Sequence, residues 1–283
     1  MPELPEVETV KAALVPVMAG GVISHADIRR PDLRYPLPEN LKEVLSGAPV
    51  DFVRRRAKII LIGVRSSVMM LHLGMSGSVR ISAHKPNAKP HDHIELEVQK
   101  QGQSWWVTLN DPRRFGYIDL VPETAFAAHK SIASLGPEPV AVKGDKLMSD
   151  LLDLSYLNQA LDGAKAPIKS FLLDQSKIAG LGNIYVCEAL YRAGISPRRA
   201  AHSVKGVRAA RLLPAIQTVL AQAIAQGGTS LRDHKQPDGK LGYFVQSLAV
   251  YGRQGAPCHH CQTPIATIRQ AGRASFYCPR CQR

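Results

Sequence analysis

Residues 258–281 read CHHCQTPIATIRQAGRASFYCPRC, and this stretch sets the architecture of the carboxyl-terminal end of the chain. Cys258 and Cys261 form one Cys-x-x-Cys pair, and sixteen residues separate it from a second pair, Cys278 and Cys281. Four thiolates suit one tetrahedral Zn²⁺ ion, and a site closed by four protein ligands has no open position for water or substrate. The spacing therefore predicts one structural zinc ion, with a redox dithiol as the alternative.

The stretch between the two cysteine pairs, residues 263–277, has the character of a β-hairpin. The module is therefore predicted to be a zinc ribbon or β-hairpin zinc finger. Arg269 and Arg273 lie on this hairpin. Guanidinium groups on a rigid hairpin suit a phosphate contact or a probe of a DNA groove, although a solvated basic face is the ordinary alternative.

Ahead of this module, from about residue 147, the apolar pattern is that of helices. Ile216, Leu220 and Ala223 recur at helical spacing, and the helix they predict ends at Gly227 and Gly228. The stretch 227–242 is rich in glycine and polar residues and is longer than most connections. Such a loop is expected to have a function.

The amino-terminal part of the chain is predicted to be rich in strands, with one helix at its start. Pro5 suits the first turn of a helix, and Val7, Val10 and Leu14 recur at helical spacing up to about Met18. Alternating and continuous apolar runs then predict strands in residues 50–64, 68–73, 94–99, 105–109 and 117–121.

These patterns predict an α+β multidomain protein. Residues 1–130 are expected to form an amino-terminal β-sandwich with flanking helices. Residues 131–244 are expected to form a helical domain, and residues 245–283 the zinc module.

The composition favours a folded protein that binds a polyanion. Hydrophobic residues make up 45% of the 283 residues, and 36 Lys and Arg against 23 Asp and Glu give a net charge of +13. An excess of this size attracts phosphates through Coulomb steering and counterion release. Nucleic acid is the predicted partner, and a merely basic soluble protein is the alternative.

The sequence predicts a cytoplasmic protein. No run reaches the roughly 18 apolar residues of a membrane span, and the amino terminus is acidic where a signal peptide would be cationic and then apolar. Four of the five cysteines lie in the zinc motif, which suits a reducing compartment. The fifth, Cys187, is predicted to be a small buried hydrophobe.

Taken together with the zinc motif, four further motifs give the chain its resemblance to the bacterial formamidopyrimidine-DNA glycosylases. They are MPELPEVET (1–9), LHLGMSG (71–77), DPRRFG (111–116) and GLGNIY (180–185). The resemblance runs through essentially the whole chain in order. It implies that residues 131–244 form a helix-two-turn-helix domain and that the module at the end is a β-hairpin zinc finger.

The resemblance implies a bifunctional glycosylase and abasic-site lyase of base excision repair that acts on oxidised purines, namely 8-oxoguanine and formamidopyrimidines. Once Met1 is removed, the amine of Pro2 is the nucleophile that forms a Schiff base and then cuts the strand by β,δ-elimination. An α-amino group has an ordinary pKa of about 7.7 to 8.0, and the helix that follows would lower it. Glu3 matches the acid at the sugar ring oxygen, Glu6 a supporting carboxylate, and Lys58 a lysine that contacts phosphate beside the lesion.

An enzyme that acts on a base must evert the nucleotide from the duplex and fill the space that it leaves. By resemblance, Met75, Arg113 and Phe115 are these wedge residues. The resemblance also implies contacts with DNA phosphates, which fall on His72, Lys169, Asn183 and Arg273.

A pocket for the everted base is assigned by the same resemblance to Glu188, Thr229 and Tyr243. The loop 229–243 corresponds to the lid over the damaged purine. This chain has His234 and Lys235 where the family pattern predicts an apolar or aromatic residue, which leaves the lesion preference open.

Two other functions remain open at this point. An endonuclease VIII-like glycosylase for oxidised pyrimidines would share the amine chemistry, although Leu4 and the long lid favour the purine enzyme. A non-catalytic, zinc-containing DNA-binding protein would explain the charge and the cysteines but would not need Pro2 and Glu3. The expected partner is double-stranded DNA with oxidised purines or abasic sites. The expected state is a monomer in the bacterial cytoplasm, associated with the nucleoid and not with a membrane.

Overall fold

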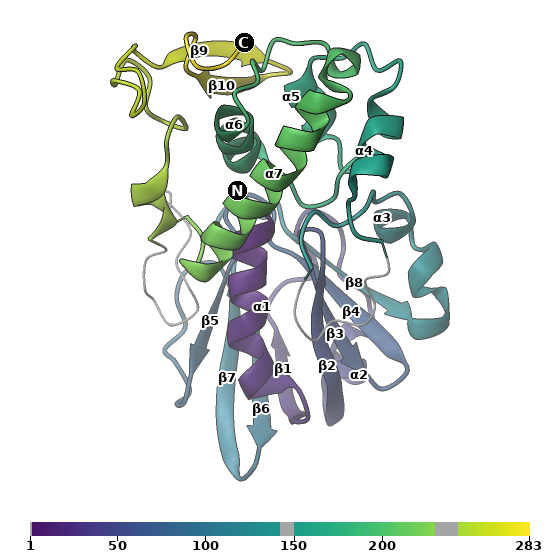
Figure 1. Ribbon diagram of the computed structural model, residues 1–283. Helices are drawn as coiled ribbons and strands as arrows, with labels where there is room; N and C mark the ends of the chain where they lie inside the picture. The colour runs from purple at the N-terminus through teal and green to yellow at the C-terminus, as the bar shows by residue number, and fades with distance from the viewer. Residues whose placement is uncertain (1, 142–149, 230–242) are drawn as a thin grey trace. The chain divides into compact units, whose positions relative to one another are not determined.

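The computed structural model describes residues 2–141, 150–229 and 243–283 (Figure 1). Two compact units make up the chain: residues 1–133 with 226–245, and residues 134–225 with 246–283. This grouping by contacts is a different division from the three domains expected from the sequence, which remain a prediction. Within the described residues, no helix has both the length and the apolar character needed to cross a membrane.

The first unit is built on an eight-stranded antiparallel sheet with the strand order β5-β7-β6-β1-β2-β3-β4-β8. The strands are β1 (Val22–Ile28), β2 (Ala48–Arg56), β3 (Ile59–Val64), β4 (Ser67–His72), β5 (Ser78–Ser82), β6 (Asp92–Lys100), β7 (Gln103–Asn110) and β8 (Tyr117–Pro122). The helical elements of this unit are α1 (Leu4–Met18), α2 (Leu41–Leu45), η1 (Glu123–Ala128) and α3 (Lys130–Ala133).

The predicted sandwich consists of two halves of this single sheet. Only a short pairing, Val22 with Pro49 and Ile23 with Ala48, joins β1 to β2. Apolar side chains from both halves and from α1 share one core, which includes Val10, Ile23, Ile62, Met69 and Leu96. The alternation that predicted strands in the sequence therefore corresponds to the inner face of this core.

Residues 50–64, predicted as one strand region, form two strands joined by a tight turn. Ala57 adopts a left-handed conformation with a φ of 52°, which breaks the extended backbone between β2 and β3. Lys58 is the next residue, so the conformation of this turn sets the position of the Lys58 Cα and Cβ atoms. Elements β1, α2 and β5 were not predicted from the sequence, because their short runs carry weak periodicity.

The second unit is helical and ends in the cysteine-rich module. Its helices are α4 (Leu154–Leu161), α5 (Ile168–Leu173), α6 (Asn183–Arg192), η2 (Ala201–Val204) and α7 (Val207–Ala225), and η3 (Phe244–Ser247) spans the sequence boundary between the two units. The antiparallel hairpin β9 (Ala266–Gln270) and β10 (Arg273–Tyr277) confirms the hairpin predicted between the cysteine pairs. Gln282 and Gln270 tie the module to the helices by donating to the carbonyls of Ile195 and Pro197.

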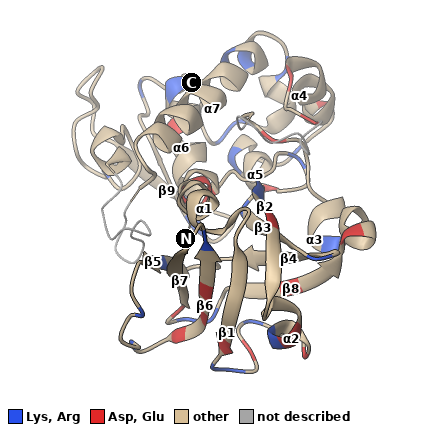
Figure 2. Cartoon of the chain, turned by 90° about the horizontal axis from the view of Figure 1, so that it is seen from below, with Lys and Arg blue, Asp and Glu red and all other residues tan. Residues whose placement is uncertain are grey.

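Basic residues occur in both units and are not confined to one element. Figure 2 shows Lys and Arg segments at α2, α3 and α5 and next to the carboxyl terminus. Acidic residues are interspersed with them along the sheet. The net charge of +13 is thus spread over the chain. Which basic residues could contact DNA has to be judged from the position of each side chain.

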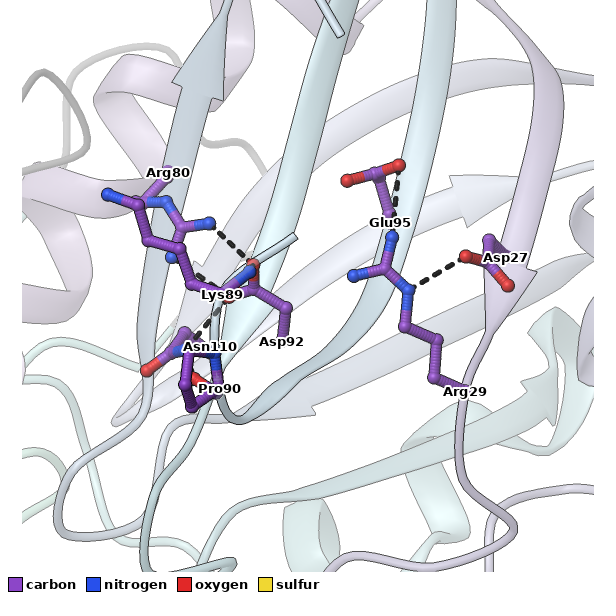
Figure 3. A network of polar contacts seen from close by, with 8 residues as sticks. All are labelled: Asp27, Arg29, Arg80, Lys89, Pro90, Asp92, Glu95 and Asn110. Atoms are coloured by element: carbon purple, nitrogen blue, oxygen red, sulfur yellow. Dashed lines mark hydrogen bonds and ion pairs between the residues drawn. The ribbon is translucent and has the colours of Figure 1, made fainter. Parts of the chain in front are cut away.

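A network of polar contacts fixes the ends of strands β5, β6 and β7 (Figure 3). Asp92 is buried and accepts two hydrogen bonds from Arg80, at 2.9 and 2.8 Å, and others from the Asn110 amide and the Lys89 backbone N–H. Burial alone would raise the pKa of Asp92, but the hydrogen bonds, led by those from Arg80, lower it to about 2. The folded protein therefore stabilises the charged form of the Asp92 carboxylate.

We predict that Asp92→Asn removes a pH-dependent part of the stability. A carboxyl group with a lowered pKa stabilises the fold fully above its unfolded pKa of about 3.9, and this stabilisation is lost as the pH falls towards about 2. The difference in unfolding free energy between the native chain and the variant should shrink over that range. Urea unfolding at a series of pH values measures it, and a difference that does not change with pH would contradict the prediction.

Candidate functional site

The amino-terminal end of α1 holds a buried acidic cluster. Pro2, Glu3 and Glu6 are all buried, and Glu3 and Glu6 form a reciprocal capping box at the start of the helix. The backbone N–H of Glu3 donates to Glu6 Oε2 at 2.8 Å. This bond fixes the backbone next to Pro2, so the three residues predicted to carry out the chemistry lie together.

Glu6 also holds the start of the predicted lid. Its Oε1 accepts hydrogen bonds from the Thr229 backbone N–H at 2.7 Å and from the Thr229 hydroxyl at 2.9 Å. Gly228 precedes Thr229 with a φ of 76°, and a Cβ added there would lie 2.9 Å from Glu6 Oε1. A glycine is therefore needed where the lid segment passes the carboxylate.

The two described ends of the lid pair with each other. Thr229 and Tyr243 form an antiparallel bridge, and the Tyr243 side chain is 61% exposed. His234 and Lys235, which depart from the family pattern, lie outside the described residues. The assignment of Thr229 and Tyr243 to a lesion pocket stays a prediction, although Thr229 does lie directly against Glu6.

His72 lies at the end of β4 in a neutral form. Burial, followed by the positive charges of Lys58 and Arg34, lowers the pKa of His72 to about 4. Its ring stacks on Tyr117 with 5.1 Å between ring centroids, and its Nδ1 accepts a hydrogen bond from the Gly74 N–H at 3.0 Å. The ring proton must then lie on Nε2, where it could be donated to a phosphate oxygen.

The three predicted wedge residues are exposed on two loops. Met75 is 38% and Phe115 is 43% exposed, and the Arg113 guanidinium lies 4.7 Å from the Phe115 ring centroid. Large apolar side chains held outside the core favour a binding role over core packing.

A buried aspartate locks the two wedge loops together. Asp111 accepts hydrogen bonds from the Ser76 hydroxyl at 2.6 Å and from the Gly116 N–H at 2.8 Å. The Ser76 hydroxyl oxygen in turn accepts a hydrogen bond from the backbone N–H of Arg113 at 3.2 Å. Sequence reasoning gave Asp111 and Ser76 no role, and the only signal was their position inside the two motifs.

In the second unit, the residues predicted to bind phosphate differ in exposure. Arg273 is exposed on the hairpin, and Asn183 begins α6, where its amide donates to the Ala274 carbonyl at 3.0 Å. Lys169 is fully buried, and its ammonium donates to the same carbonyl and to the Ser275 hydroxyl, both at 2.7 Å. The structure places Lys169 under the hairpin, where these oxygens solvate its charge, and its phosphate contact stays a prediction.

Glu188, like Lys169, is a buried charged residue whose hydrogen bonds hold a neighbouring segment of the second unit. Its carboxylate is buried in the second unit and accepts the backbone N–H groups of Ala249, Val250 and Tyr251 at 2.8 to 3.0 Å. Burial raises the pKa of Glu188 against the opposing effect of these hydrogen bonds. The carboxylate holds the chain that leads into the zinc module, and its role in lining a lesion pocket stays a prediction.

The four cysteines of the motif form one cluster, as predicted. Their sulfur atoms all lie within 4.8 Å of one another, with 3.9 Å between the Sγ atoms of Cys258 and Cys281 and 3.4 Å between those of Cys261 and Cys278. Zinc–sulfur bonds of about 2.3 Å in a tetrahedron require sulfur separations of about 3.8 Å, so the donor set fits a zinc ion. Cys187 is buried in the apolar cluster beside these residues, as expected.

Family models match nearly the whole chain. The formamidopyrimidine-DNA glycosylase N-terminal domain matches residues 1–118, and the formamidopyrimidine-DNA glycosylase H2TH domain matches residues 135–235. A zinc finger found in FPG and IleRS matches residues 255–283. These matches cover the acidic cluster, the wedge loops, α6 and the cysteines.

Individual relatives match over their full length. A formamidopyrimidine-DNA glycosylase of Rhodospirillum centenum is 50% identical, with all of both chains covered. Among solved structures, a mutant of the Lactococcus lactis FPG in complex with DNA containing Fapy-dG is 30% identical, with a TM-score of 0.88 and all of both chains covered. The Lactococcus lactis Fpg in complex with DNA containing an abasic site is 29% identical, with a TM-score of 0.87 and the same coverage.

We predict that Gly74→Ala destabilises the fold by about 2–4 kcal/mol, because it combines backbone strain with overpacking. Gly74 has a φ of 61°, and an added Cβ would lie 2.2 Å from the backbone carbonyl carbon of Phe115. Gly102→Ala is the matched control, since Gly102 has a φ of 77° but open space around it. The control should lose only about 1–2 kcal/mol in urea unfolding. Equal losses in the two variants would show that the wedge loops do not pack as described.

We also predict that Cys258→Ser releases the zinc and unfolds the module, because the bound metal supplies its folding free energy. Zinc content should fall well below one ion per chain, and amide hydrogen exchange should accelerate within residues 255–283 but not in the sheet. Cys187→Ala is the control and should keep its zinc, since Cys187 lies outside the sulfur cluster. A Cys258 variant with full zinc and normal exchange would rule out this ligand set.

Proposed function

The chain belongs to the formamidopyrimidine-DNA glycosylase family, and on this basis we propose that it excises oxidised purines from double-stranded DNA and cuts the strand at the abasic site. The observation that carries the proposal is the buried cluster of Pro2, Glu3 and Glu6 at the start of α1. A capping box alone would account for the two buried carboxyl groups, but a DNA-binding protein without catalytic activity would not need the secondary amine of Pro2 beside them. Burying a carboxylate costs free energy that only specific hydrogen bonds offset.

The proposed reaction begins at the nitrogen of Pro2, after removal of Met1. Its lone pair forms a bond with C1′ of the damaged nucleotide, and the glycosidic bond breaks, with its electron pair leaving on the base. The nitrogen loses its proton, Glu3 protonates the ring oxygen, and the sugar opens to an iminium ion. Glu6 is a positioning residue in this scheme, because it holds the Glu3 backbone at 2.8 Å.

Strand cleavage follows from the same iminium ion. The positive nitrogen acidifies the hydrogen on C2′, and loss of that proton expels the 3′ phosphate. A second elimination expels the 5′ phosphate, and hydrolysis of the imine then regenerates the amine. The Lactococcus lactis relative that was solved with an abasic site in its DNA supports this lyase half of the proposal.

The proposed DNA contacts are of two kinds, exposed wedge residues that enter the duplex and basic or polar residues that bind phosphates. In the first unit, Met75, Arg113 and Phe115 fill the space left by the everted nucleotide. Lys58 contacts the phosphate beside the lesion as a cation, whereas neutral His72 donates a hydrogen bond. Arg273 and Asn183 contribute phosphate contacts from the second unit, with Lys169 supporting the hairpin from below.

We propose that the protein works as a monomer in the bacterial cytoplasm, at the nucleoid. Its relatives are bacterial glycosylases, and the substrate in this proposal is chromosomal DNA. The preference for purines over pyrimidines is tested by comparing excision of 8-oxoguanine with excision of thymine glycol from one duplex. Faster excision of thymine glycol would favour the endonuclease VIII-like alternative.

We predict that borohydride captures a covalent adduct between the protein and a duplex containing 8-oxoguanine. Pro2→Gln should abolish capture, because a large second residue retains Met1 and removes the secondary amine. Glu3→Gln should slow capture by at least about 100-fold, the usual contribution of a general acid. Thr9→Ala, about one helical turn beyond Glu6 on α1, is the control and should capture at the native rate.

The same assay separates the enzyme from a DNA-binding protein. Tight binding of damaged DNA without an adduct or a cut strand would favour the non-catalytic zinc protein. Mass spectrometry of the purified chain completes the test, because an active protein that still carries Met1 could not use Pro2 as the nucleophile.

A further inference from the structure

Arg55 is a fully buried arginine that joins helix α1 to the turn before Lys58. Its side chain has 0% exposure, and its Nε donates to Glu8 Oε2 at 2.8 Å. Its Nη1 donates to the backbone carbonyl of Ala57, also at 2.8 Å. One planar guanidinium therefore contacts the helix that carries the acidic cluster and the turn that carries Lys58.

Glu8 is itself fixed in place. Its other carboxylate oxygen lies 2.7 Å from the ammonium of Lys11, one helical turn further along α1, and its side chain is 7% exposed. A buried ion pair is a weak source of stability, because desolvation of both charges offsets most of their attraction. The Lys11, Glu8 and Arg55 network is therefore better explained by the geometry that it imposes than by the stability that it supplies.

The geometry in question is that of the β2–β3 turn. Ala57 adopts the left-handed region with a φ of 52°, which is disfavoured for a residue with a Cβ. The Arg56–Ile59 pair closes the hairpin around this backbone, and the Arg55 guanidinium adds a buried contact at the Ala57 carbonyl. The Ala57 carbonyl belongs to the peptide group that joins Ala57 to Lys58. The orientation of this peptide group sets the direction in which the Lys58 side chain leaves the backbone.

We propose that Arg55, held by Glu8, is a positioning residue for Lys58: it fixes the left-handed turn at Ala57 and so places the Lys58 ammonium against a DNA phosphate. The inference rests on the proposed function, since it assigns Lys58 a phosphate contact. Arg55 has no exposed side-chain surface and does not touch DNA, whereas Lys58, although buried, keeps 8% exposure. On this inference, the contribution of Arg55 to DNA binding acts through Lys58.

The salt dependence of DNA binding tests this inference. Each phosphate contact contributes about one unit to the slope of log K against log salt concentration. Lys58→Met should reduce the slope by about one unit. Arg55→Lys should reduce it by a similar amount although the charge is retained, because one ammonium cannot reproduce the two-pronged contact of the guanidinium. The double variant should equal Lys58→Met, since both changes remove the same contact.

Two further variants separate positioning from folding. Ala57→Gly in the Arg55→Lys background should restore part of the slope, because glycine adopts a positive φ without a supporting contact. If Arg55→Lys does not fold, Glu8→Gln is measured in its place, because this variant keeps a hydrogen-bond acceptor for Arg55. It should reduce the slope by less than one unit. All slopes are measured below the melting temperature of each variant.

Arg29→Lys is the matched control. Arg29 also joins two carboxylates, donating to Asp27 at 2.8 Å and lying 3.2 Å from Glu95, but it contacts neither α1 nor the turn (Figure 3). Its slope should equal that of the native protein. A native slope in Arg55→Lys beside a reduced slope in Lys58→Met would overturn the inference. A native slope in Lys58→Met would remove both the inference and the assigned phosphate contact, whereas borohydride capture would still report on the reaction.

Discussion

The buried acidic cluster at the start of α1 depends on the hydrogen bonds of one carboxylate, that of Glu6. It accepts the Glu3 N–H on one oxygen and the N–H and hydroxyl of Thr229 on the other. A carboxylate removed from water must have such donors, and each donor is fixed in return. The backbone beside Pro2 and the start of the predicted lid are therefore tied to a single group, although Glu6 and Thr229 lie 223 positions apart in the sequence.

Buried polar groups have the same effect elsewhere in each unit. Asp111 joins the two wedge loops, Glu188 holds three consecutive N–H groups before the zinc module, and Lys169 supports the hairpin that carries Arg273. For Asp111 and Lys169, the exposed residues predicted to touch DNA differ from the buried residue that holds their loop or hairpin. A site that must keep its groups within a fraction of an ångström requires this second set of contacts.

The sequence was sufficient for features that depend on local spacing. The zinc cluster follows from two Cys-x-x-Cys pairs, α1 from the period of Val7, Val10 and Leu14, and the sheet from apolar alternation. The family motifs led to the acidic cluster and the wedge residues. The structure brings Glu3 and Glu6 together and exposes Met75 and Phe115.

The sequence was insufficient where the partner of a polar residue lies far along the chain. Lys169 was predicted to contact phosphate, yet its partners are 105 and 106 residues away on the hairpin. Glu188 was predicted to line a pocket, yet it binds backbone groups 61 to 63 residues away. A periodic pattern shows that such a residue lies on a helix but does not show whether its charge meets water or a buried donor. The partners of a buried charged residue depend on the fold, which a periodic pattern does not give.

The pair of Lys58 and His72 shows how this distinction reaches the chemistry. Burial, and after it the charge of Lys58, lowers the pKa of His72 to about 4, so His72 is neutral at neutral pH. Two cations side by side would repel each other until DNA arrived, and the fold would be destabilised in its free state. With a neutral histidine whose Nδ1 already accepts the Gly74 N–H, the ring presents a donor at Nε2 without that repulsion. In the proposed function, a phosphate would receive one charge from Lys58 and one oriented hydrogen bond from His72, each next to a backbone turn of positive φ, at Ala57 and at Gly74.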